Sequence, residues 1–283
     1  MGQDKLQQQR FELKYLVKND VAHAIREFVR SYLDVDEYGA TLPELSYPVH
    51  SLYIDSPDLK LYQSTINGDK NRFKLRLRFY ENKAAAPVYF EIKRRMNNPI
   101  SKQRGGVRRA AVDGLLAGQL PDPSNLVSRD PNQLVALQRF SQLASELNAR
   151  PIAHVAYLRE AWISRRDNSV RVTMDRDVRV EPEPMGRLTT EMTHPSYVFD
   201  GEVVLELKFT NRLPDWFKDL VRVFGLMQCG AAKYVDGVTL IGADRFFNAL
   251  AVRGPLPGLN GAHVNKGKNA HLKRRERALA SIS

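Results

Sequence analysis

The stretch RFKLRLRFY, from Arg72 to Tyr80, alternates strictly between bulky apolar and cationic side chains. Side chains of a β-strand point to opposite faces in turn, so the alternation places the apolar residues on one face and Lys74, Arg76 and Arg78 on the other. Polar alternation alone is expected for any antiparallel sheet with one wet face. Here the polar positions are nearly all cationic, and this charge restricts the folds that can accommodate the strand.

The stretch VYFEIKRR, from Val88 to Arg95, repeats the pattern with Glu91, Lys93 and Arg95 on one face. Cations two residues apart on a strand, about 6.7 Å, repel by about 0.6 kcal/mol in water and by about 2.5 kcal/mol at an effective dielectric constant near ~20. An open, solvated sheet face therefore tolerates them. An enclosed interior requires an anion or acidic side chains among them.

The apolar faces of both stretches favour the enclosed arrangement, because their bulky side chains require burial. Apolar side chains pointing outward against helices, with charges pointing inward, give a barrel with a basic lumen. Glu12, Glu91 and Glu206 would be rare acids in that lumen, where they pair with cations or bind a divalent metal through oxygen. A phosphate chain is the natural occupant, since Arg offers bidentate contacts and Lys a point charge.

Further segments complete an α+β domain, which we expect to span residues 1–252. Period-two patterns predict strands at Arg10–Val17, Val49–Ser56, Ile152–Ser164, Ser169–Val180 and Glu202–Phe209. Apolar stripes at helical spacing predict helices at Asp20–Leu33, Asn132–Leu147 and Pro214–Leu226, and from Lys233 towards Leu250.

The composition indicates a globular protein with an anionic partner. Of 283 residues, 43% are hydrophobic, and 43 Lys and Arg against 32 Asp and Glu give a net charge of +11. Such an excess implies nucleic acid, a membrane surface or a phosphate-rich small molecule. Residues 72–109 hold twelve basic and two acidic residues, which indicates a site within the fold. Residues 253–283 hold seven basic and one acidic residue and predict a disordered tail, either solvated or docking on a polyanion.

The sequence also favours a cytoplasmic location. A single cysteine, Cys229, excludes an intramolecular disulfide, so a reducing compartment is the default. No run approaches the roughly 18 apolar residues of a membrane span, and the first residues lack the apolar region of a signal peptide.

Eight short motifs, in this order, resemble the vacuolar transporter chaperone (VTC) domain, a polyphosphate polymerase module of the triphosphate tunnel metalloenzyme, or CYTH-like, superfamily. They are FELKY at 11–15, KLRLRFY at 74–80, FEIKRR at 90–95, KQR at 102–104, YLR at 157–159, RVTMD at 171–175, LELKF at 205–209 and AAKYVDGV at 231–238. The resemblance implies a closed antiparallel β-barrel, a tunnel of about eight strands covered by helices. It also implies that the tunnel binds ATP or inorganic polyphosphate with Mn²⁺ or Mg²⁺.

The resemblance further implies roles for individual residues, with Lys74 added from the alternation of its strand. Charge stabilisation in catalysis falls to Arg76, Arg78, Lys93, Arg159, Arg171 and Lys233. Phosphate binding falls to Lys14, Lys74, Lys102, Arg104, Tyr157 and Lys208, and metal binding to Glu206. The cations would hold the triphosphate and the growing chain, while the metal neutralises the transferring phosphoryl group.

Two departures from the family pattern leave the activity open. AAKY replaces the frequent FSKY, so a hydroxyl contact is missing, whereas Glu12-Leu13-Lys14, without a second preceding acid, favours polymerase over triphosphatase. Triphosphate hydrolysis and a non-catalytic polyanion-binding module remain the alternatives. A specific nucleic-acid partner is disfavoured, because Phe73, Phe79 and Phe90 lie on the apolar face and cannot stack bases beside the cations.

Overall fold

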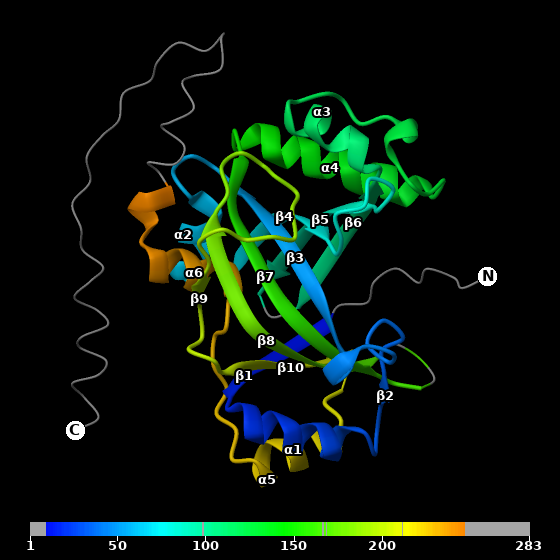
Figure 1. Ribbon diagram of the computed structural model, residues 1–283, viewed down its shortest axis with the longest axis vertical. Coiled ribbons are helices and arrows are strands. Elements are labelled where there is room, and N and C mark those ends of the chain that lie inside the picture. The colour runs from blue at the N-terminus through cyan, green and yellow to red at the C-terminus, as the bar shows by residue number, and fades with distance from the viewer. Residues whose placement is uncertain (1–9, 98, 166, 168, 211, 247–283) are drawn as a thin grey trace. The chain divides into compact units, whose positions relative to one another are not determined.

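The structure is a computed structural model that describes residues 10–246 apart from residues 98, 166, 168 and 211 (Figure 1). Ten strands form one antiparallel sheet, ordered β2-β7-β3-β4-β5-β6-β1-β10-β8-β9. They are β1 (Arg10–Val17), β2 (Asp34–Val35), β3 (Ser46–Asp55), β4 (Asn71–Phe79), β5 (Val88–Met96), β6 (Ile100–Val107), β7 (Arg150–Ile163), β8 (Val170–Pro182), β9 (Ser196–Tyr197) and β10 (Val203–Thr210). All seven strands that the sequence predicts are confirmed; β6 and the two-residue strands β2 and β9 were not anticipated.

The sheet curves back on itself, because β7 also pairs with β8 from Ala153 opposite Pro182 to Ile163 opposite Arg171. Between β6 and β1, however, the pairing is reduced to Arg10 opposite Ile100. The prediction of a closed antiparallel β-barrel of about eight strands is therefore wrong, because this seam leaves the sheet open. The antiparallel α+β architecture itself is confirmed.

The α-helices that the structure describes are α1 (Asn19–Val29), α2 (Lys60–Ile66), α3 (Val112–Leu116), α4 (Pro131–Glu146), α5 (Asp215–Val223) and α6 (Lys233–Ile241). All but α6 lie on the apolar outer side of the sheet, as predicted. In Figure 1, α3 and α4 lie over β5 and β6, while α1 and α5 lie below β1 and β10. Leu75, Leu77 and Phe90 pack with Phe140 of α4, and Leu205 packs in a second cluster with the α1 and α5 residues.

Helix α6 packs against the opposite, inner face of the sheet. Its Tyr234 and Val238 join a cluster with Val180 and with Val204, which shares a face of β10 with Glu206. The approach is close at Gly237, where a Cβ atom would lie 2.8 Å from Cγ1 of Val180. Helix α6 thus covers one end of the charged face. Helix α6 ends at Ile241, because Gly242 has a φ of 95°, so the prediction of one helix continuing from Lys233 towards Leu250 is wrong at this point. Residues beyond 246, including the predicted tail at 253–283, lie outside the described residues.

Candidate functional site

The cationic side chains of the alternating strands lie on the concave inner face of the curved sheet, which we call the charged interior. Lys93 of β5 reaches Glu12 of β1 at 2.8 Å although β6 lies between these strands in the sheet order. Arg78 of β4 likewise donates a hydrogen bond of 3.0 Å to the hydroxyl of Tyr157 on β7, across β3. Such contacts between non-adjacent strands require a curved sheet, so the charges are enclosed rather than solvated on an open layer.

Glu91 is the centre of one ion-pair network and is fully buried. Its Oε1 lies 2.5 Å from Lys102 Nζ, and its Oε2 lies 2.7 Å from Arg76 Nη2 and 3.8 Å from Arg78 Nε. Burial alone would raise the pKa of Glu91, but Lys102, Arg76 and Arg78 hold it well below its usual range. Desolvation also lowers the pKa of Lys102 to about 7 against the pull of Glu91. The glutamate therefore orients three cations towards the interior.

Asp175 and Glu206 form a second network where α6 meets the sheet. Arg159 donates two hydrogen bonds of 2.7 and 2.8 Å to Asp175, and Lys233 Nζ lies 2.6 Å from the same carboxylate. Lys208 lies 2.6 Å from Oε2 of Glu206. Burial opposes ionisation of both acids, yet the surrounding cations lower the pKa of each. Both carboxylates are thus ionised and occupied by cations.

Lys74 differs from its neighbours, because no ion pair or hydrogen bond to it occurs within the described part of the chain. Desolvation, followed by repulsion from Lys14 and Lys93, lowers the pKa of its ammonium to about 7. Among the buried polar atoms without a hydrogen-bond partner in the described residues, Ser51 Oγ, Arg78 Nε and Glu91 Oε1 lie in the interior, and the last two are in ion pairs. Buried polar groups in proteins are normally hydrogen bonded, and Ser51 Oγ and Arg78 Nε are donors that a ligand oxygen could engage.

The structure brings the predicted site residues together, with Arg171 at the edge of the charged interior and Arg104 exposed outside it. Lys14, Lys74, Arg76, Arg78, Lys93, Lys102, Tyr157, Arg159, Glu206, Lys208 and Lys233 share the charged interior. Arg171 lies beside Lys208 in the strand register and pairs with Asp36 at 2.7 Å. Arg104 is exposed, and its guanidinium stacks on the ring of Tyr89 at 3.6 Å.

Two interior residues had no role in the sequence analysis. Asp175 forms ion pairs with Arg159 and Lys233. Tyr53 accepts a hydrogen bond of 3.3 Å from Arg76. The signal for Asp175 was present, because it lies four residues after Arg171 on the same face of an alternating strand. Tyr53 gave no such signal, since its contact depends on the pairing of β3 with β4.

The interior is cationic even after its acids are counted. It holds the cations Lys14, Lys74, Arg76, Arg78, Lys93, Lys102, Arg159, Arg171, Lys208 and Lys233, and the carboxylates Glu12, Asp36, Glu91, Asp175 and Glu206. Ten cations thus face five carboxylates in a region largely shielded from water. An anionic ligand is the partner that such an arrangement binds best.

A preassembled metal centre is not found within the described residues. No three side chains of His, Cys, Asp or Glu among them lie close enough to hold a metal ion. Glu206, the predicted ligand, has both oxygens in contact with lysines. Mg²⁺ commonly binds through one or two carboxylates with the remaining positions filled by water and substrate phosphates. The residues present therefore fit a metal that binds together with a phosphate ligand.

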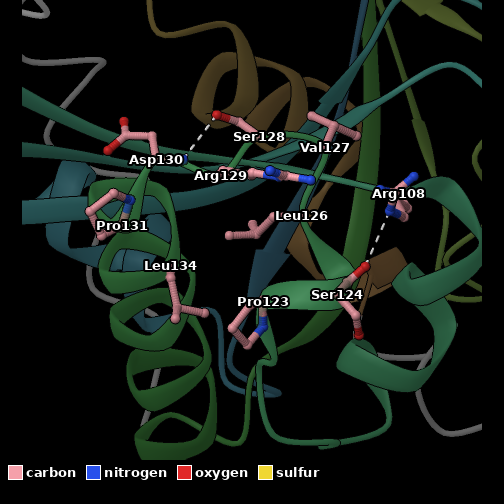
Figure 2. Close-up of a pocket in the computed structure, with 10 residues that line it drawn as sticks. All are labelled: Arg108, Pro123, Ser124, Leu126, Val127, Ser128, Arg129, Asp130, Pro131 and Leu134. Atoms are coloured by element: carbon pink, nitrogen blue, oxygen red, sulfur yellow. Dashed lines mark hydrogen bonds between the residues drawn. The ribbon is translucent and has the colours of Figure 1, made fainter.

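A separate cavity of about 500 Å³ lies on the outer side of the sheet, beside the start of α4 (Figure 2). Leu126 and Leu134 line it together with Pro123, and Arg108 and Arg129 project towards it. None of the predicted site residues lines this cavity. It is therefore distinct from the charged interior.

The known proteins to which this chain is similar include one sequence relative and two solved structures of partial similarity. The chain is 23% identical over 269 residues to subunit 4 of the vacuolar transporter chaperone complex of Trypanosoma brucei brucei. The aligned region covers 83% of this chain and 34% of the relative. The chain thus spans about a third of the length of that relative.

Two solved structures are described as candidate adenylate cyclases. That of Bacillus halodurans has a TM-score of 0.44 and 14% identity over 79% of this chain and 93% of its own. That of Vibrio parahaemolyticus has a TM-score of 0.40 and 12% identity over 81% and 97%. These scores are too low to carry an argument about fold or function.

The described helices include none with the length and apolar character needed to cross a membrane. Residues 9–241 match the VTC domain family, which agrees with the order of the motifs along the strands of the charged interior. The match extends over most of the sequence. The chain therefore belongs to the VTC domain family.

Proposed function

We propose that the charged interior binds the triphosphate of ATP and a polyphosphate chain, and transfers the γ-phosphoryl group to the end of that chain. The observation that carries this proposal is the excess of ten buried or half-buried cations over five carboxylates on one concave face. A linear phosphate polymer supplies the missing negative charge at regular intervals. The curved sheet would act as a tunnel around the polymer.

The unsatisfied donors of the charged interior support this assignment energetically. A buried donor without a partner costs about 1–3 kcal/mol, and an unpaired buried charge costs more. Ser51 Oγ and Arg78 Nε are buried donors without a hydrogen-bond partner among the described residues. Phosphate oxygens would accept hydrogen bonds from both, and would give the half-buried ammonium of Lys74 a partner as well.

Phosphoryl transfer requires positioning and charge stabilisation more than covalent chemistry from the protein. Arg76 and Arg78, held by Glu91, are preoriented donors for the equatorial oxygens of the transferring group. Lys233 and Arg159, held by Asp175, would bind the neighbouring phosphates. A divalent ion bound through Glu206 would neutralise charge on the phosphate oxygens.

Binding of Mn²⁺ or Mg²⁺ at Glu206 requires its three lysines to shift. Lys14, Lys208 and Lys233 lie on this carboxylate in the free protein. Phosphate oxygens offer these lysines alternative partners, so the metal and the phosphate chain would enter together. We include in the proposal the domain at residues 1–252, a basic tail at 253–283 that is either solvated or docks on a polyanion, and a cytoplasmic location.

The proposal is tested by incubating the purified chain with ATP and either Mn²⁺ or Mg²⁺ and resolving the products by gel electrophoresis and phosphorus NMR. Long phosphate polymer supports the polymerase, and release of free phosphate alone supports the triphosphatase. Binding of polyphosphate without turnover supports the non-catalytic module. Arg76→Ala probes the interior, and Arg129→Ala, a cation beside the outer cavity, controls for the loss of one positive charge.

A further inference from the structure

Four tyrosines form a continuous row along one end of the charged interior. The ring centroids of Tyr38 and Tyr47 lie 6.1 Å apart, those of Tyr47 and Tyr80 6.3 Å, and those of Tyr80 and Tyr89 6.3 Å. We call these four residues the tyrosine row. At its far end the guanidinium of Arg104 stacks on Tyr89.

The tyrosine row lies at the end of the interior away from α6. Tyr47 and Tyr53 are on the same face of β3, and Tyr53 stacks on Tyr234 of α6 with centroids 4.6 Å apart. Six residues of strand separate Tyr47 from Tyr53, about 20 Å. Helix α6 therefore covers one end, and the tyrosine row lines the other.

Cations connect the tyrosine row to the phosphate-binding groups. Tyr47 is the cross-strand neighbour of Arg159. Burial raises the pKa of Tyr47 to about 12, with Arg159 and Arg171 near enough to oppose the shift, so the phenol stays protonated. A ligand whose phosphates contact Arg159 would therefore present its remaining part to Tyr47.

The row differs from the other interior tyrosines in its polar contacts. The hydroxyls of Tyr53, Tyr157 and Tyr234 are hydrogen bonded to protein side chains. Within the described residues, the hydroxyls of the tyrosine row have no such bond, and the side chain of Tyr38 is 67% exposed. Aromatic faces contribute little to binding a phosphate chain, which cations already bind. They do bind nucleobases by stacking.

We propose that the tyrosine row is a nucleobase subsite, on which the base of a nucleoside triphosphate stacks while its phosphates pass Arg159 into the charged interior. The base contacts the partly exposed rings of Tyr38 and Tyr47, and the tyrosine hydroxyls remain free to donate to the base or ribose. This inference rests on the proposed function, since it places the non-phosphate part of the same substrate.

The experiment compares two ligands that differ in the base. ATP and inorganic triphosphate are titrated by calorimetry into the unaltered chain and into Tyr47→Ala, Tyr38→Ala and Tyr47→Phe. Tyr197→Ala removes an exposed tyrosine outside the row as a control. We expect both alanine variants to weaken ATP binding about tenfold and triphosphate binding less than about twofold. Tyr47→Phe keeps the ring and should retain ATP affinity.

The other outcomes contradict the inference in separable ways. If the affinities for ATP and triphosphate fall equally in Tyr47→Ala and Tyr38→Ala, the tyrosine row stabilises the phosphate-binding site and does not bind a base. If neither affinity falls, the tyrosine row does not contact the ligand. Triphosphate binding by the unaltered chain would still support the proposed function. If inorganic triphosphate does not bind the unaltered chain, the proposed function fails, and the subsite fails with it.

Discussion

Lys14 and Lys233 share one oxygen of Glu206, with each Nζ 3.3 Å from Oε1. Lys14 belongs to β1 and Lys233 is the first residue of α6, so this carboxylate joins the helix to the sheet. Lys14 also donates a hydrogen bond of 2.8 Å to the carbonyl of Ala231, just before the helix. Glu206 thus has a structural role in the free protein as well as its proposed role in metal binding.

Glu206→Gln is therefore expected to lower stability as well as metal-dependent activity. Removing one partner of a buried ion pair costs about 3–5 kcal/mol, because it leaves the other charge uncompensated. The pairing of Lys233 with Asp175 survives, which places the expected loss near the lower end, about 3 kcal/mol. Urea unfolding measures it, with the exposed Glu37→Gln as control. Added triphosphate should restore more stability to Glu206→Gln than to Glu37→Gln; equal gains would contradict the structural role.

Arg76→Ala is expected to reduce the rate of phosphoryl transfer. The other ion-pair partners of Glu91, Arg78 and Lys102, should stay in place. Loss of one preorganised charge-stabilising donor costs on the order of 3 kcal/mol in the transition state, about a hundredfold in kcat/KM. Lys83→Ala, which removes a cation that is 81% exposed, should leave kcat/KM unchanged. Near-native turnover in Arg76→Ala would remove this residue from the catalytic group.

Proton uptake on ligand binding tests the state of Lys74. The pKa of this lysine is about 7 in the free protein because of desolvation and of repulsion from Lys14 and Lys93. A bound phosphate chain favours the ammonium, so affinity should fall as the pH rises above about 7, and binding at about pH 8 should take up protons. Calorimetry of triphosphate binding in buffers of different ionisation enthalpy measures the uptake. Lys74→Arg keeps the charge and should take up about one proton fewer; equal uptake would contradict the prediction.

The alternation of β4 and β5 was sufficient to predict their faces, because the period of a strand depends only on local geometry. The sequence ISKQRGGV of β6 lacks that alternation, and its glycines serve packing instead: a Cβ at Gly105 would lie 2.8 Å from the carbonyl oxygen of Gln133 in α4. No local pattern reports such an approach. For this reason β6 was missed, and with it the incomplete seam between β6 and β1.

The pairing of individual charges was equally beyond local patterns. The sequence left open whether Glu12 and Glu91 pair with cations or bind a metal, and in the structure both pair with cations. It could not indicate that Glu12 binds Lys93, because that contact joins residues 81 positions apart across an intervening strand. The metal role of Glu206 stays a prediction, since both oxygens of its carboxylate contact lysines in the structure.

The close packing of α6 against β8 can be tested by substitution at Gly237. An alanine there places a methyl group 2.8 Å from Val180 Cγ1, and such overpacking costs about 1–3 kcal/mol. Val180→Ala removes the atoms that would clash, so the double variant should recover part of the loss. A double-mutant cycle of urea unfolding measures the coupling, expected at about 1 kcal/mol. Strict additivity would show that the helix adjusts without strain.

The buried pair His50 and His154 gives the protein an acid-sensitive stability that is independent of the charged interior. His50 Nδ1 lies 3.0 Å from His154 Nε2. Burial, reinforced by Arg179, lowers the pKa of His50 to about 4, and burial together with His50, Arg179 and Arg187 lowers that of His154 to about 3. Glu181, 3.9 Å from His154, does not offset these effects.

Because an unfolded histidine titrates near about 6.5, the unfolded chain binds more protons than the folded chain between about pH 6.5 and pH 4. Stability from the pair is therefore complete above about pH 6.5 and is lost as the pH falls, by on the order of 3 kcal/mol. Urea midpoints measured at intervals from about pH 7 to pH 4.5 should show this slope, and the double variant His50→Gln, His154→Gln should lack much of it. The exposed His23→Gln should keep the full slope. If the double variant also keeps it, carboxylates elsewhere cause the acid sensitivity, and the neutral state of this pair does not contribute.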